Sequence, residues 1–237
     1  MKIALRKLQP SHLTANEEAL RQCRIALEHK DRENYADAQD AMRRYWRAVG
    51  ERPKTEELHP PVAAEVLLTV GILTGWIGSK NQTKTAQETA KDLISESITY
   101  FDSVRDFQKV AAARVELAFC YYREGELNEA RDMIREALEK LTPGGNTRAR
   151  ALLKLSALEC SAARFHEAHR ILNDDAPYFR HSGITRLRAA ITKKWRSSCE
   201  TSPSLKRETI TLRKPSVNSR RPITNSNLLV ILSIVRT

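Results

Sequence analysis

A pattern of small and apolar residues returns four times along this chain of 237 residues, and it constrains the fold more than any other feature. The clearest copy runs from residue 111 to 143. Apolar or small residues recur every three or four positions on one segment and then on a second, with Arg-Glu-Gly-Glu at 123–126 between them. This period predicts two antiparallel α-helices joined by a tight turn. Gly125 suits the turn because glycine adopts left-handed backbone angles at low cost.

The other copies show the same order of residues less regularly. A later copy has Ala163 where the clearest copy has Gly125, and its Ala168 follows Ala130 by 38 residues. The residues that define the pattern across the four copies are Ala26, Tyr35, Ala38, Gly71, Ala90, Leu117, Ala118, Tyr121, Gly125, Ala130, Ala137, Pro143, Leu155 and Ala168. With Pro and Gly residues at its breaks, the pattern predicts an all-α fold with helices at residues 15–29, 33–49, 61–79, 83–104, 107–123, 127–141, 147–162 and 165–180.

This spacing resembles the tetratricopeptide repeat (TPR), a helix pair of about 34 residues. The resemblance covers residues 15–182, after an N-terminal segment at 1–14, and the repeats are longer than the family standard. It implies a right-handed superhelical array, an α-solenoid of about four antiparallel helix pairs. The longer repeats also look similar to the sensor regions of some bacterial transcription activators.

The resemblance also implies a binding surface, because in this family the first helix of each pair lines a concave groove that takes a peptide or a protein. On those helices it points to Trp76, Lys80, Phe119, Tyr122, Arg123 and Arg150. Val115 and Leu153 lie on the same helices, and for these two and Phe119 packing between helices is an equally good interpretation. Relatives that grip a peptide's terminal carboxylate use Lys and Asn on this face. Apolar residues stand at the corresponding places here, which argues against binding of that kind.

The net charge of +11 comes almost entirely from the C-terminal part of the chain. Residues 186–237 hold 12 Lys and Arg against 2 Asp and Glu, which leaves 28 against 27 in residues 1–185. Residues 183–237 also lack helical periodicity, which predicts a disordered basic tail. One interpretation is a native arm, through which alone we would expect nucleic acid to bind. The other, which we favour, is a shift of reading frame near Thr185.

Other chemistry has weak support in the sequence. His166 and His169 share a helical turn but have no third metal ligand at a suitable spacing. The order Gly78-Ser79-Lys80 differs from that of a phosphate-binding loop, so we expect the glycines at 71, 75 and 78 to allow close helix packing. The four cysteines form no CxxC pair, which predicts reduced core thiols. We expect no apolar run long enough to span a membrane, no secretory signal, no cofactor and no catalytic site.

These observations favour a cytoplasmic, non-catalytic protein-interaction module of bacterial type, whose partner is a protein or a peptide. The alternative is a sensor or regulatory repeat region of a larger bacterial signalling or transcription-regulatory protein. Both hypotheses use the same groove.

Overall fold

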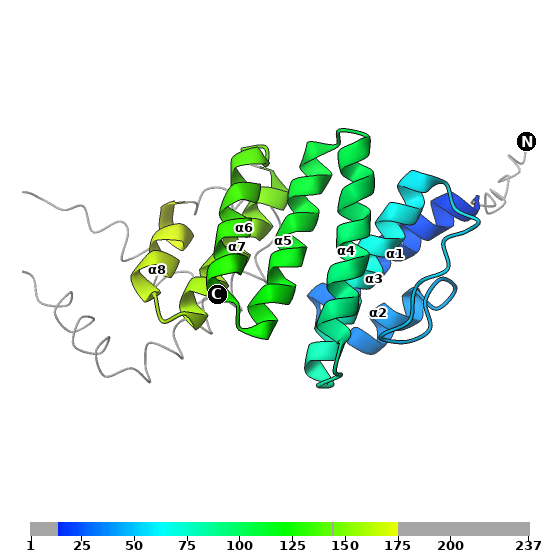
Figure 1. The fold of residues 1–237 in the computed structure, drawn as a ribbon, viewed down its shortest axis with the longest axis horizontal. Helices are drawn as coiled ribbons and strands as arrows, with labels where there is room; N and C mark the ends of the chain where they lie inside the picture. Colours follow the sequence, from blue (N-terminus) through cyan, green and yellow to red (C-terminus); the bar gives the residue numbers. More distant parts are fainter. Residues whose placement is uncertain (1–13, 144, 175–237) are drawn as a thin grey trace, which may run out of the picture. The chain divides into compact units, whose positions relative to one another are not determined.

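The computed structural model describes residues 14–143 and 145–174, and in these ranges the chain folds into eight α-helices and no strand (Figure 1). The helices are α1 (Ala15–Asp31), α2 (Tyr35–Ala41), α3 (Pro60–Lys80), α4 (Ala86–Ser103), α5 (Phe107–Glu124), α6 (Leu127–Lys140), α7 (Asn146–Ser161) and α8 (Phe165–Asp174). The all-α fold is therefore confirmed for this part of the chain. The predicted tail at 183–237 lies outside the described residues.

Most predicted helices agree with the observed ones to within three residues, but the second was predicted too long. Helix α2 ends at Ala41. Beyond it, the amides of Met42 and Arg43 donate to carbonyls three residues earlier in the chain instead of four. The following loop folds back, with the amide of Lys54 donating to the carbonyl of Tyr45 at 2.8 Å. Tyr45 and Trp46 are buried nonetheless, so the apolar spacing that predicted a longer helix serves the core without one.

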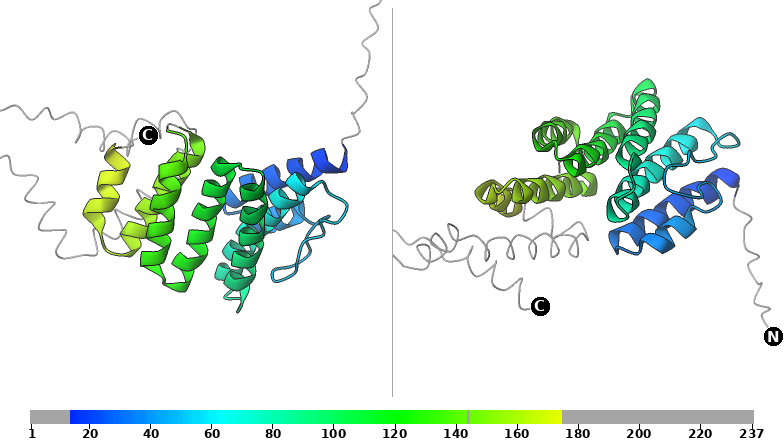
Figure 2. Two further views of the ribbon diagram at one scale, coloured as in Figure 1. Left: turned by 45° about the horizontal axis from the view of Figure 1, so that its top comes forward. Right: turned by 60° about the horizontal axis from the view of Figure 1, so that its bottom comes forward.

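The helices pack on one another in chain order, and Figures 1 and 2 show this succession from α1 to α8. The contacts within the pairs α1–α2, α3–α4, α5–α6 and α7–α8 are joined by contacts between pairs. Among these, α3 touches both α1 and α5, and α5 touches α7. The odd-numbered helices are thus neighbours in a row, which brings together residues far apart in the sequence.

A single type of turn ends the first helix of every pair. After α5, the amide of Gly125 donates to the carbonyl of Tyr122 and the amide of Glu126 donates to that of Tyr121. The same two bonds, with a left-handed residue at the same place, recur at Glu33, Gln82 and Ala163. This is the Schellman arrangement, in which the left-handed residue satisfies carbonyls at the end of a helix. The repetition in sequence is therefore also a repetition of backbone geometry.

Helix α3 contradicts one expectation from the sequence. It spans 21 residues and is long and apolar enough to cross a membrane, whereas no such run was expected. Its most apolar stretch is 72% buried within the structure. It contacts α1, α2, α4 and α5, so its apolar surface is covered by other helices, as in the core helix of a helical domain.

The glycines of α3 lie at its closest approach to α4. A Cβ at Gly71 would stand 2.7 Å from Cγ1 of Ile94, and a Cβ at Gly78 would stand 2.2 Å from the Cβ of Ala86. Neither distance is compatible with van der Waals contact. These glycines are what allows the two helices to pack so closely, and a phosphate loop is not formed because the segment is helical throughout.

Candidate functional site

Four aromatic rings from three helices form a continuous stack, which we call the aromatic ladder: Tyr35, Trp76, Phe119 and Tyr122. The ring of Trp76 lies between those of Tyr35 and Phe119, with centroid distances of 6.5 and 6.3 Å and nearly parallel planes. Phe119 in turn lies 5.2 Å from Tyr122. Such contacts stabilise beyond the area that they bury. The ladder therefore joins the second, third and fifth helices into one surface.

Four cations contact rings of the ladder and a fifth, Arg150, is linked to them through Asp31; we call the five the cluster cations: Lys30, Lys80, Arg123, Arg150 and Lys154. The guanidinium of Arg123 lies 4.4 Å from the centroid of Trp76. The other ring contacts are Lys30 over Trp76 at 5.7 Å, Lys80 over Tyr35 at 5.0 Å and Lys154 over Phe119 at 4.7 Å. Each distance is within the range of a cation–π interaction.

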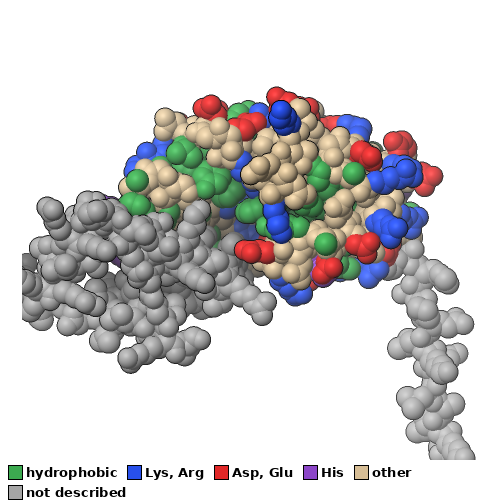
Figure 3. All heavy atoms as spheres, turned by 90° about the horizontal axis from the view of Figure 1, so that it is seen from below, with side chains coloured by type: hydrophobic (Ala, Val, Ile, Leu, Met, Phe, Trp, Pro, Cys, Tyr) green, Lys and Arg blue, Asp and Glu red, His purple; other side chains and the backbone are tan. Residues whose placement is uncertain are grey.

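Two carboxylates neutralise part of this charge. Asp31 pairs with Lys30 at 2.8 Å and accepts from Nη1 of Arg150 at 2.6 Å, a contact between residues 119 positions apart. Glu116 forms an ion pair with Lys154. Five cations thus face two carboxylates within the cluster. On the face that Figure 3 shows, charges of both signs are interspersed.

Burial changes the protonation equilibria of the cluster. Burial lowers the pKa of Lys154 to about 8, although the neighbouring carboxylate of Glu116 acts against this shift. The pKa of Arg123 is also lowered, because burial disfavours its charged form. Burial acts to raise the pKa of Glu116, but the cations Lys154 and Lys30 outweigh it and the pKa lies below its usual value. The cluster holds positive charge at a cost in solvation.

Three buried donors of the cluster form no hydrogen bond among the described residues: Nε1 of Trp76, Nη2 of Arg123 and Nζ of Lys154, the last of which is nevertheless in an ion pair with Glu116. Nη1 of Arg123 donates to the carbonyl of Phe119 at 3.2 Å, which leaves the other end of the guanidinium unmatched. A buried donor without an acceptor is unfavourable by about 1–3 kcal/mol. Nε1 of Trp76 and Nη2 of Arg123 thus lack an acceptor, while Oε1 of Gln87, which like Nη1 of Arg123 lies beside Gly75, is a buried acceptor without a donor among the described residues.

The structure brings together five of the six residues expected to line the groove. Trp76, Phe119, Tyr122 and Arg123 form or touch the ladder, and the exposed Lys80 lies over the ring of Tyr35. The sixth, the exposed Arg150, is linked to the ladder through Asp31 and Lys30. The hydroxyl groups of Tyr122 and Ser161 are hydrogen-bonded at 2.7 Å, which links α5 to α7.

Val115 and Leu153, for which the sequence left the groove and the core open, are buried in the core at 3% and 0% exposure. Sequence reasoning missed Lys30, Asp31, Glu116 and Lys154 as members of the cluster. Helical spacing could have found two of them, because Glu116 precedes Phe119 by three residues and Lys154 follows Arg150 by four. For Asp31 the sequence carries no comparable signal.

The residues that define the repeat lie mostly in the core. Those with at most 1% exposure are Ala26, Ala38, Ala90, Ala118, Ala130, Ala137 and Ala168. Leu117 and Leu155 are buried, Tyr121 is half-buried and Pro143 is exposed. Small side chains at these places permit close contact between helix backbones.

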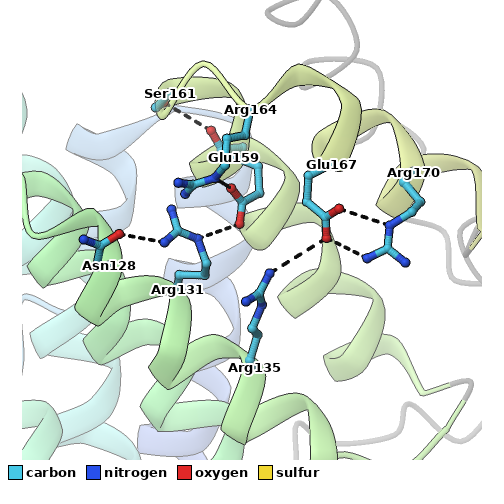
Figure 4. A network of polar contacts seen from close by, with 9 residues as sticks. Asn128, Arg131, Arg135, Glu159, Ser161, Arg164, Glu167 and Arg170 are labelled. Atoms are coloured by element: carbon cyan, nitrogen blue, oxygen red, sulfur yellow. Dashed lines mark hydrogen bonds and ion pairs between the residues drawn. The ribbon is translucent and has the colours of Figure 1, made fainter.

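A second polar network ties α6, α7 and α8 together (Figure 4). The carboxylate of Glu159 is completely buried and accepts from Nε of Arg131 at 2.8 Å and from Nε of Arg164 at 2.5 Å. Beside it, the more exposed Glu167 pairs with Arg170 at 2.6 Å and with Arg135 at 3.8 Å. Glu159 and Glu167 each lie between two guanidinium groups, an arrangement that is typical of a structural role. In the Glu159 network, Nη2 of Arg131 is a buried donor without a partner among the described residues.

Within residues 14–143 and 145–174, no group of three or more His, Cys, Asp and Glu is arranged to hold a metal ion. Cys23 and Cys120 are buried thiols, and burial raises the pKa of each to about 11. Cys199 lies outside the described residues. No protein-family model matches the chain, and no curated protein shows significant similarity to it.

Proposed function

We propose that this protein is a non-catalytic interaction module, in which stacked TPR-like helix pairs form a superhelical groove that binds a peptide or a protein. The observation that carries the proposal is the convergence of four aromatic rings and five cations on the odd-numbered helices and the start of α2. Trp, Tyr and Arg are the residues that most often dominate the free energy of binding at interfaces.

The ladder has features of a recognition surface as well as of a core. Phe119 is buried, which anchors the ladder, whereas Trp76, Tyr122 and Arg123 are half-buried and Lys80 is exposed. Partly exposed aromatic rings held by neighbouring helices lose little conformational entropy when a ligand covers them. The same positions are those that the resemblance assigns to the groove.

The proposal is tested by selecting peptides from a displayed library of unstructured segments on the full chain and then measuring their affinity for a double variant, Tyr122→Ala with Arg123→Ala. Truncation of an anchor residue at an interface costs about 2 kcal/mol or more of binding free energy. The double variant should therefore bind the peptide at least about 30-fold more weakly. Far-UV circular dichroism should remain helical in the variant. The exposed Arg43→Ala, outside the cluster, is the control.

Peptides that bind the double variant as tightly as the unchanged chain would refute the groove. Failure to select any peptide above background would also count against a peptide-binding function. A loss of affinity in Arg43→Ala equal to that in the double variant would show that the effect is one of surface charge in general.

A further inference from the structure

Resting on the proposed function, we infer that the cluster recognises an acidic segment, a peptide that places a Glu or Asp carboxylate against Arg123 beside an apolar side chain on the aromatic ladder. The surface of this ligand complements three separate properties of the cluster: its charge, its unmatched donors and the fixed position of Arg123.

Charge is the first property. The five cluster cations are opposed by Asp31 and Glu116, whose contacts are already made to Lys30, Arg150 and Lys154. Arg123 and Lys80 have no carboxylate partner in the described part of the chain and rest on aromatic rings instead. A carboxylate from outside would be the natural partner of these two groups, since a pair in a half-buried site is screened less by salt than one at the surface.

Unmatched donors are the second property. Nη2 of Arg123 and Nε1 of Trp76 belong to side chains in direct contact, and neither has an acceptor. A carboxylate supplies two acceptor oxygens and no donor, and hydrogen bonds between guanidinium and carboxylate groups are among the strongest in proteins. A cationic segment would supply no acceptor to these two donors.

Position is the third property, because Arg123 is held in place. It packs on Trp76 and Phe119, and its Nη1 lies 3.1 Å from where a Cβ at residue 75 would stand, so the glycine there makes room for it. A guanidinium fixed by packing gives up less entropy on binding than a free one. The half-buried ring of Trp76 beside it offers apolar surface to a neighbouring side chain of the ligand.

The test is a displayed peptide library with one fixed Phe and four flanking positions that hold Glu, Gln or Lys at equal frequency. It is selected on the full chain, on Arg123→Gln with Lys80→Gln, and on the control Arg43→Gln. All three proteins keep the basic residues 186–237, so nonspecific attraction to those residues is the same in each. A charged hydrogen bond predicts about tenfold enrichment of Glu over Gln on the full chain and on the control. On the double variant the enrichment should fall to about twofold or less.

Equal enrichment of Glu on all three proteins would overturn the inference, because the attraction would then come from outside the cluster. Selection of Gln or Lys peptides that still depend on Tyr122 and Trp76 would overturn the acidic preference while leaving the groove intact. A single-stranded oligodeoxythymidine that competes in a manner dependent on Arg123 and Lys80, without Glu enrichment, would instead assign the cluster to nucleic acid. Circular dichroism of each variant excludes loss of folding as the cause.

Discussion

Replacing Glu159 by Gln tests the buried network of α6, α7 and α8. Gln keeps the shape of the side chain but removes its charge, so the guanidinium of Arg131, with a side chain 10% exposed, would be left buried without a counter-ion. Removing one partner from a buried ion pair costs about 3–5 kcal/mol. Because the side chain of Arg164 is 43% exposed and can be hydrated, we expect the lower end, about 3 kcal/mol. For a domain of this size that lowers the Tm by roughly 6–12 °C.

The assay is urea unfolding followed by far-UV circular dichroism, with Glu167→Gln as the matched control. Glu167 also lies between two Arg side chains, and its pKa is lowered chiefly by its hydrogen bond from Arg170, but it is 28% exposed. Exposed ion pairs contribute about 0–1 kcal/mol. Burial should make the Glu159 network stabilise the fold more than the exposed one. This expectation would be refuted if the two variants lost equal free energy of unfolding, or if Glu159→Gln lost less than about 1 kcal/mol.

Three further changes follow from the geometry. Gly78→Ala should lower the free energy of unfolding by about 2 kcal/mol, because its Cβ would overlap α4 and force the helices apart; an unchanged urea midpoint would contradict the close approach. Ala163→Gly should raise that free energy by about 0.5–1 kcal/mol, because residue 163 has φ 58°, and destabilisation would contradict the left-handed turn. Because the pKa of Lys154 falls from 10.5 to about 8 on folding, the folded state loses that proton first, and stability should rise from pH 8 to 9. Above pH 9 the raised pKa values of Cys23 and Cys120 oppose this rise, because the unfolded thiols ionise first. In Lys154→Met the urea midpoint of unfolding should not rise between pH 8 and 9. If it rises as in the unchanged chain, the pH dependence does not come from Lys154.

The sequence predicted the helices well because their apolar faces recur with the helical period. Its errors arose where tertiary contacts decide the backbone. Helix α4 begins three residues later than predicted because Thr85 takes a left-handed conformation with φ 65°, and α2 ends early where the loop folds back onto it. Neither feature has a periodic signal in the sequence.

The resemblance to the tetratricopeptide repeat pointed to Trp76 and Arg123 on the first helices, and the structure places these two side chains in contact. The resemblance could not indicate the pairing of Asp31 with Arg150, since that contact depends on how neighbouring helices pack over a long stretch of chain. The complete burial of Glu159 was equally hidden, because a charged residue in a helix usually faces solvent.

The central claim is that the aromatic ladder is the ligand-binding surface, and the fluorescence of Trp76 tests it most directly. In the variant Trp46→Phe with Trp195→Phe, Trp76 is the remaining tryptophan, and circular dichroism checks that the fold is kept. Titration with a labelled peptide selected on the full chain should shift the emission of Trp76 to shorter wavelength as water is excluded from the ring. The change should saturate with the Kd that fluorescence anisotropy gives for the same peptide. An emission spectrum that stays unchanged at concentrations where anisotropy shows full binding would place the ligand elsewhere and contradict the account.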